Sequence, residues 1–140
     1  MTPQETQDFI LQLETLRDAY EKYREIQEQE HALLSRRGPI VEWNILVRQK
    51  NLAMQTVHGI ENRQAHLKQR WQNLGDLRQR PEYGAVRERL SQLQAQLTRV
   101  LTCERMIESL LYSGGYLQSV IAHRTASEAI PPASVPPKAR

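Results

Sequence analysis

The chain has 140 residues, the size of one ordinary domain, and only 39% of them are hydrophobic, so a thick globular core is not expected. Six glycines and seven prolines provide too few turn residues for a many-stranded sheet, which excludes an all-β fold. The net charge of +3 is polarised, because residues 1–30 carry −5 and the remainder carries +8. An acidic first helix packed against basic later helices is the simplest explanation of this asymmetry.

Leucine and glutamine together make up 32 of the residues, a usage typical of long amphipathic helices. Cys103 is the single cysteine, so nothing in the chain requires an oxidising compartment. The N-terminus lacks a basic region followed by an apolar run. No stretch approaches the roughly eighteen uninterrupted apolar residues of a membrane span. We therefore expect a cytoplasmic protein with no secretion signal and no membrane insertion.

The first predicted helix spans about residues 3–37. It begins after Thr2, because residues 2–5 (Thr-Pro-Gln-Glu) have the form of a capping box with proline at the first helical position. Apolar residues then follow at alternating spacings of four and three: Phe9, Leu13, Leu16, Tyr20 and Tyr23. The next two places on this stripe are polar, Gln27 and Glu30. Such a narrow stripe is typical of a helix packed on partner helices.

The second predicted helix spans about residues 39–75 and has the strongest periodicity in the chain. Two series of residues each recur every seven positions: Leu46, Ala53, Ile60, Leu67 and Leu74, alternating with Trp43, Lys50, Val57, Gln64 and Trp71. This is a heptad seam, and Lys50 and Gln64 are its polar members. Polar seam residues usually lower stability while helping to set register and partner.

The third predicted helix spans about residues 82–122. Its apolar residues resume the same spacing: Val86, Leu90, Leu93, Leu97 and Val100. Beyond them the apolar positions occupy more than one stripe, which implies more than one partner surface. The sequence thus predicts an all-α fold, an elongated antiparallel bundle of about three long helices with coiled-coil packing. Residues 1–124 are expected to form the helical domain, and the Pro-rich tail 125–140 is expected to be disordered.

Catalysis has no local support in the sequence, so we expect neither an enzyme nor a cofactor. His58 and His66 lie more than two helical turns apart without an HExxH pattern, so we interpret them as surface residues and expect no metal site. Cys103 is interpreted as a small packing residue. Basic pairs such as Arg36 and Arg37 are not interleaved with aromatic residues, as single-strand binders require, so nucleic acid is not an expected partner.

Three groups of residues follow one another along the chain: Glu30-His31-Ala32-Leu33-Leu34 with Gly38, Trp43, Leu46 and Lys50; then Glu61, Arg63, Trp71 and Leu74-Gly75; then Ile107-Glu108 with aliphatic positions up to Leu117. Their order resembles the FlgN family of flagellar type III export chaperones, over roughly residues 10–121. This resemblance implies a cytoplasmic, non-enzymatic chaperone. Such a protein binds the C-terminal helical region of hook–filament junction proteins and delivers them to the flagellar export apparatus.

The resemblance also implies where partners would bind. Carried over by position, the client-binding face consists of Ile107, Leu110, Leu111 and Leu117. The tail after Tyr116 has no aromatic residue for docking on the export gate, so Tyr112 and Tyr116 are its nearest substitutes.

Two other functions stay open. One is a structural coiled-coil component of a secretion apparatus, and the other is a basic helical protein that binds nucleic acid. The identity of the client is open, and so is a homo-oligomeric state.

Overall fold

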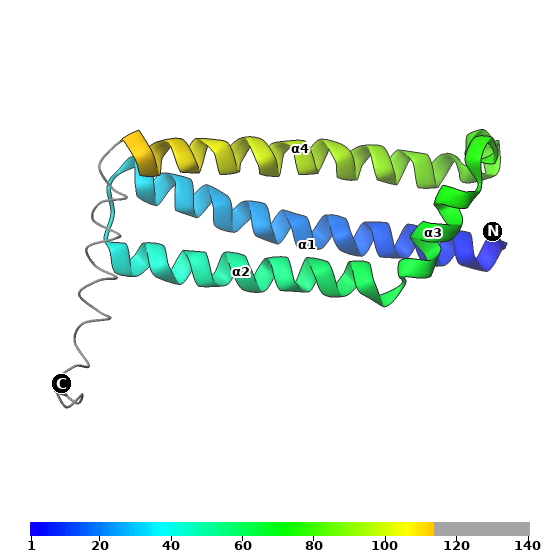
Figure 1. The fold of residues 1–140 in the computed structure, drawn as a ribbon, viewed down its shortest axis with the longest axis horizontal. Helices are drawn as coiled ribbons and strands as arrows, with labels where there is room; N and C mark the ends of the chain where they lie inside the picture. The colour runs from blue at the N-terminus through cyan, green and yellow to red at the C-terminus, as the bar shows by residue number, and fades with distance from the viewer. Residues whose placement is uncertain (114–140) are drawn as a thin grey trace, which may run out of the picture.

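The computed structural model describes residues 1–113, which fold into α-helices and short 3-10 helices without a strand in this part of the chain, so the all-α class is confirmed. The elements in chain order are α1 (Pro3–Ser35), α2 (Ile40–Arg63), α3 (Ala65–Asn73), η1 (Gly75–Gln79), η2 (Pro81–Tyr83) and α4 (Gly84–Ser113). Figure 1 shows α1 lying between α2 and α4. α2 is antiparallel to α1, and α4 is parallel to it. The predicted end of the third helix, the domain boundary at residue 124 and the tail 125–140 lie outside the described residues.

The N-terminus of α1 has the predicted capping box. The amide of Glu5 donates to Thr2 Oγ1 at 3.0 Å, and the amide of Thr2 donates to Glu5 Oε1 at 2.8 Å. The Thr2 amide, and to a smaller extent the Arg70 guanidinium, hold the pKa of the Glu5 carboxyl below its usual value. Arg70 Nε lies 2.6 Å from Glu5 Oε2, so the capping residue also ties α3 to the start of α1.

The expected single helix over residues 39–75 is wrong, because the chain leaves helical geometry at Gln64 (φ −132°, ψ 45°) and continues as the shorter α3. The break redirects the chain so that α3 passes beside the N-terminal part of α1 and leads to the start of α4 (Figure 1). There the ring of Trp71 packs against Phe9 at 6.1 Å and against Tyr83 at 5.7 Å between centroids. The heptad spacing conceals this break, since apolar residues continue in register on both sides of it.

The connection between α1 and α2 is tight. Arg37 adopts a left-handed conformation (φ 54°), and the amide of Gly38 donates to the Leu33 carbonyl at 2.8 Å. A Cβ atom at position 38 would collide with the buried Leu33 side chain. The absence of a side chain at Gly38 therefore allows α2 to start directly beside the end of α1.

The buried apolar residues form two separate clusters along the bundle. The larger cluster joins α1, α2, α3, η2 and α4, from Phe9 and Trp71 at one end to Tyr23 and Val100. The smaller cluster lies at the α1–α2 connection and consists of Leu33, Leu34, Trp43 and Ile107. The residues between the two clusters are polar, and they form the site described next.

A pair of glycine substitutions tests the close packing at the α1–α2 connection. Gly38→Ala should destabilise the fold by about 1–3 kcal/mol, because the added methyl group overpacks the Leu33 pocket. The control is Gly59→Ala in α2, where a Cβ atom meets nothing within 4 Å. This change should stabilise the helix by about 0.5–1 kcal/mol. Urea denaturation followed by circular dichroism measures both, and equal effects would contradict this account of the connection.

Candidate functional site

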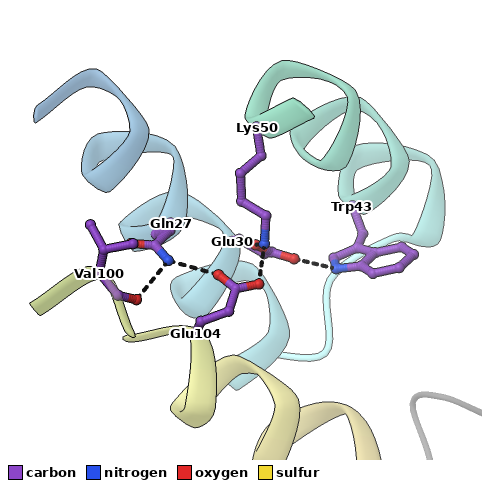
Figure 2. A network of polar contacts seen from close by, with 6 residues as sticks. All are labelled: Gln27, Glu30, Trp43, Lys50, Val100 and Glu104. Carbon is purple, nitrogen blue, oxygen red and sulfur yellow. Dashed lines mark hydrogen bonds and ion pairs between the residues drawn. The ribbon is translucent and has the colours of Figure 1, made fainter. Parts of the chain in front are cut away.

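Three long helices meet in a buried polar layer between the two apolar clusters (Figure 2). Its centre is Lys50 of α2, whose Nζ donates to Glu30 Oε1 of α1 at 2.6 Å and to Glu104 Oε1 of α4 at 2.8 Å. Trp43 Nε1 donates to the second Glu30 oxygen at 3.0 Å. One ammonium group therefore links all three helices.

Gln27 extends this layer toward α4. Its Nε2 donates to Glu104 Oε2 at 2.7 Å and to the Val100 carbonyl at 3.0 Å. Gln27 is fully buried, and its Oε1 has no hydrogen-bond partner within residues 1–113. Both oxygens of Glu104 are thus held by buried donors from two other helices, which fixes its side chain at the α1–α4 contact.

The electrostatics of the layer follow from burial and pairing. Burial acts to lower the pKa of Lys50, but the hydrogen bonds that Lys50 donates to Glu104 and Glu30, together with the charges of these carboxylates, outweigh it, and the pKa lies above the usual lysine value. The Lys50 side chain is 10% exposed and that of Glu30 only 2%, whereas Glu104 retains 34%. The formal charges of this triad sum to −1, so the layer is an acidic site that opens to solvent at Glu104.

Exposed apolar side chains are more frequent at the end of the bundle that holds this layer, where they lie on more than one side of α2 and α4. Six of the eight large exposed apolar residues within residues 1–113 lie within one turn of the polar layer or beyond it: Val41, Ile45, Leu52, Leu101, Met106 and Tyr112. Solvent-exposed apolar groups are normal one by one, but a concentration of them at one end of an elongated molecule is a candidate interaction surface.

The three predicted client-binding residues that the structure describes have two different environments. Ile107 is 1% exposed and belongs to the smaller core cluster. Leu110 and Leu111 are half-buried and pack on the outside of that cluster. Leu117 lies outside the described residues. The structure thus brings three of the four together at the end of α4 but places one of them inside the core.

The predicted docking residues are divided in a similar way. Tyr112 is 72% exposed on α4, close to Leu110 and Leu111 in the sequence. Tyr116 lies outside the described residues. Docking on an export gate through either side chain stays a prediction.

The remaining candidates have ordinary surroundings. His58 and His66 are exposed, and no group of three or more His, Cys, Asp or Glu residues within residues 1–113 is arranged to hold a metal ion. Cys103 is half-buried beside the smaller cluster, and burial raises the pKa of its thiol, with a further contribution from Glu104. A raised thiol pKa disfavours the reactive thiolate, which fits the interpretation of Cys103 as a packing residue.

The sequence analysis identified three members of the polar layer as polar seam positions, Gln27, Glu30 and Lys50, but did not predict that they meet. It did not identify Glu104 as a seam residue. The signal was present, because Glu104 follows Val100 by four positions and so takes the next place in the α4 seam.

Within residues 1–113, every helix is too short or too polar to cross a bilayer. No family model matches the chain, and no characterised protein or solved structure is detectably similar to it. The resemblance to the FlgN chaperones therefore rests on the sequence pattern alone.

Breaking the polar layer should cost far more than breaking a surface ion pair. Lys50→Met leaves the Glu30 carboxylate buried without its cation, so we expect a loss of about 3–5 kcal/mol in the free energy of unfolding. The control is Arg36→Met, which breaks the exposed pair with Glu42 (3.3 Å) and should cost less than about 1 kcal/mol. Equal losses in urea denaturation at neutral pH would contradict a structural role for the layer.

The stability difference between the natural chain and Lys50→Met should also depend on pH. The pKa of Lys50 is higher in the folded chain than its ordinary value of 10.5, so the pairing stabilises the fold fully below that pH. As the pH rises further, the stabilisation is lost. The difference in stability between the natural chain and Lys50→Met should therefore be constant from about pH 7 to 9 and shrink above about pH 10.5. Tyr20, whose pKa burial raises, contributes equally to both proteins and cancels in the difference. Burial also raises the pKa of Tyr23, but Lys50 lowers it, so Lys50→Met raises it further and the Tyr23 contribution does not cancel completely.

Proposed function

We propose that this protein is a cytoplasmic export chaperone of the flagellar type III system. It binds the C-terminal helical region of hook–filament junction proteins and delivers them to the export apparatus. The proposal includes coiled-coil packing along α1, α2 and α4, which the heptad spacing of their buried residues supports. It is an interaction function and needs no chemical step.

The observation that carries the proposal is the convergence of several residues on which the resemblance rests, although Trp71, another of them, packs at the opposite end. Glu30, Trp43 and Lys50, from two helices, are joined in the polar layer. Leu33 and Ile107 pack beside them in the smaller cluster, and Gly38 permits the turn that brings α1 and α2 together. Residues scattered over more than seventy positions of sequence thus build one end of the bundle, and that end has the exposed apolar surface.

The physical role is the shielding of an apolar helix. A junction-protein subunit awaiting export has an amphipathic helical terminus that would self-associate before assembly. Burying it against another apolar face removes that surface from water at roughly 25 cal/mol per Å². An interface made of half-buried and exposed side chains, rather than core residues, also allows the client to be released.

The burial pattern assigns different roles to the expected client-binding residues. Leu110 and Leu111, with the exposed Tyr112, would contact the client directly. Ile107 is a core residue in the free protein, so it would support this surface from below. Truncation of Ile107 is therefore a test of folding rather than of binding.

A structural coiled-coil component of a secretion apparatus is the second candidate. The observation in its favour is the elongated form of the bundle, in which α1 alone has 33 residues and is about 50 Å long. Such a component would use the exposed apolar end for permanent assembly and would show no preference for junction-protein helices.

Capture of a client fragment tests the proposal. Leu111→Glu places a charge on the half-buried surface at the end of α4 and should reduce capture of a purified junction-protein C-terminal fragment at least tenfold. Its control is Leu77→Glu in η1, an exposed leucine at the opposite end of the bundle, which should leave capture unchanged. Binding is measured by co-purification and by calorimetry.

Stability measurements separate binding from folding. The melting temperature of Leu111→Glu should stay close to that of the natural chain, whereas Leu93→Ala should lower it, because Leu93 is buried in the larger cluster and a cavity there costs about 2–5 kcal/mol. If no junction-protein fragment binds the natural chain, the chaperone proposal is wrong. If Leu111→Glu melts as early as Leu93→Ala, the surface at Leu111 is part of the core.

A further inference from the structure

The flank of α2 that faces α4 has an apolar row. Leu46 and Gln49 line a surface pocket together with residues of α1, and Lys50 points into the polar layer. Ile40, Val47 and Met54, spaced by seven, therefore occupy the other flank, on the side away from that pocket. All three are half-buried, so they contact the core with one side and solvent with the other.

The facing flank of α4 has a matching row. Gln92, Gln96 and Arg99 line a pocket with residues of α1. The opposite flank has apolar residues spaced by seven and four: Leu90, Leu97 and Leu101. Leu90 and Leu97 are half-buried, and Leu101 is 59% exposed. We call these two rows, with Glu104 between them at the polar layer, the α2–α4 face.

The α2–α4 face lacks a helix that covers it within residues 1–113. α1 packs closely along both α2 and α4, whereas α2 and α4 approach one another at few points, consistent with the arrangement in Figure 1. Two rows of half-exposed apolar side chains flanking a third helix have the form of a four-helix bundle with one helix missing. An amphipathic helix laid along both rows would bury them.

The negative charge at the centre of the α2–α4 face favours a partner helix with a positively charged side chain at that level. The triad of Glu30, Lys50 and Glu104 has a formal charge of −1, and Glu104 is its exposed member. Lys50 and Gln27 each donate one hydrogen bond to the Glu104 carboxylate. A carboxylate can accept about four hydrogen bonds, so Glu104 has capacity for a further donor. A second copy of the chain, paired about a two-fold axis at this layer, would bring two such acidic sites together. A helix with a cationic donor at this level would instead complete the layer.

We infer that the α2–α4 face is the binding site of a partner helix that has apolar residues at heptad spacing and one lysine or arginine at the level of Glu104. The inference rests on the proposed function, because it extends the binding surface from the end of α4 along α2 and α4. Apolar contacts supply most of the affinity, and the pairing with Glu104 sets the register and the specificity of the bound helix.

Three synthetic peptides test the inference on the full chain. Each is an amphipathic helix of three heptads with leucine at the seam positions, and the central seam residue is lysine, leucine or glutamate. Fluorescence anisotropy should show that the lysine peptide binds about tenfold more tightly than the glutamate peptide, as expected for a charge-assisted hydrogen bond. Glu104→Gln should remove this preference while leaving the affinity for the leucine peptide within about threefold.

Two equally exposed leucines provide a matched pair of variants that should fold normally. Leu101→Asp, on the α2–α4 face, should weaken binding of all three peptides at least tenfold. Leu52→Asp is the control, because Leu52 is 62% exposed but lies on the outer side of α2 together with Val41 and Ile45. If Leu52→Asp weakens binding and Leu101→Asp does not, the occupied surface is the outer side of α2 and the inference is wrong.

The remaining outcomes separate this inference from the chaperone proposal. A junction-protein fragment could bind the natural chain and the variants Leu101→Asp and Glu104→Gln equally well. In that case the chaperone function holds, and the α2–α4 face is not the binding site. If the lysine peptide binds as described and no junction-protein fragment binds, the α2–α4 face is the binding site and the client is another protein. Failure of all three peptides would overturn the inference, and a dimer in sedimentation experiments would then identify a second copy as the occupant.

Discussion

The buried pairing of Lys50 with Glu30 and Glu104 is the constraint on which the arrangement of the long helices depends. An ammonium group in an apolar bundle must be paired, because an uncompensated buried charge costs several kcal/mol. Lys50 finds its two carboxylates only when α1, α2 and α4 are aligned at one level. A shift of any of these helices by one turn would separate the charges, so we infer that the layer sets their register.

The same layer divides the molecule into two parts with different properties. On one side, the aromatic contacts of Trp71 with Phe9 and Tyr83 complete a core that ties α3 and η2 to α1 and α4. On the other side, the smaller cluster is surrounded by half-buried and exposed apolar side chains. The first part has most of the buried core, and the second part has the surface around Leu111 on which the chaperone proposal depends. The α2–α4 face of the partner-helix inference runs along both parts, since Met54, Leu90 and Leu97 pack against the larger cluster. Binding at the surface around Leu111 need not disturb the larger core.

The break at Gln64 ends α2 before the full length of the molecule and returns the chain to α4. A continuous helix over residues 39–75 would extend α2 along the whole length of the molecule. Instead, α3 turns across the N-terminal part of α1 and returns the chain to α4, so that α1 is the central helix that both α2 and α4 contact. Because α2 and α4 each pack on α1 and approach one another at few points, the α2–α4 face lacks a covering helix within residues 1–113.

The sequence alone determined the all-α class, the starts of α1 and α2 and the seam residues, because capping boxes, glycine–proline turns and heptad spacing act over a few neighbouring residues. It placed Lys50, Gln27 and Glu30 on their seams for the same reason. Only the tertiary structure decided that these residues meet Glu104, that Ile107 is core rather than surface, and that the chain turns at Gln64. Each of these depends on which helices pack together and at what level, and a local spacing pattern has no information about contacts across seventy residues.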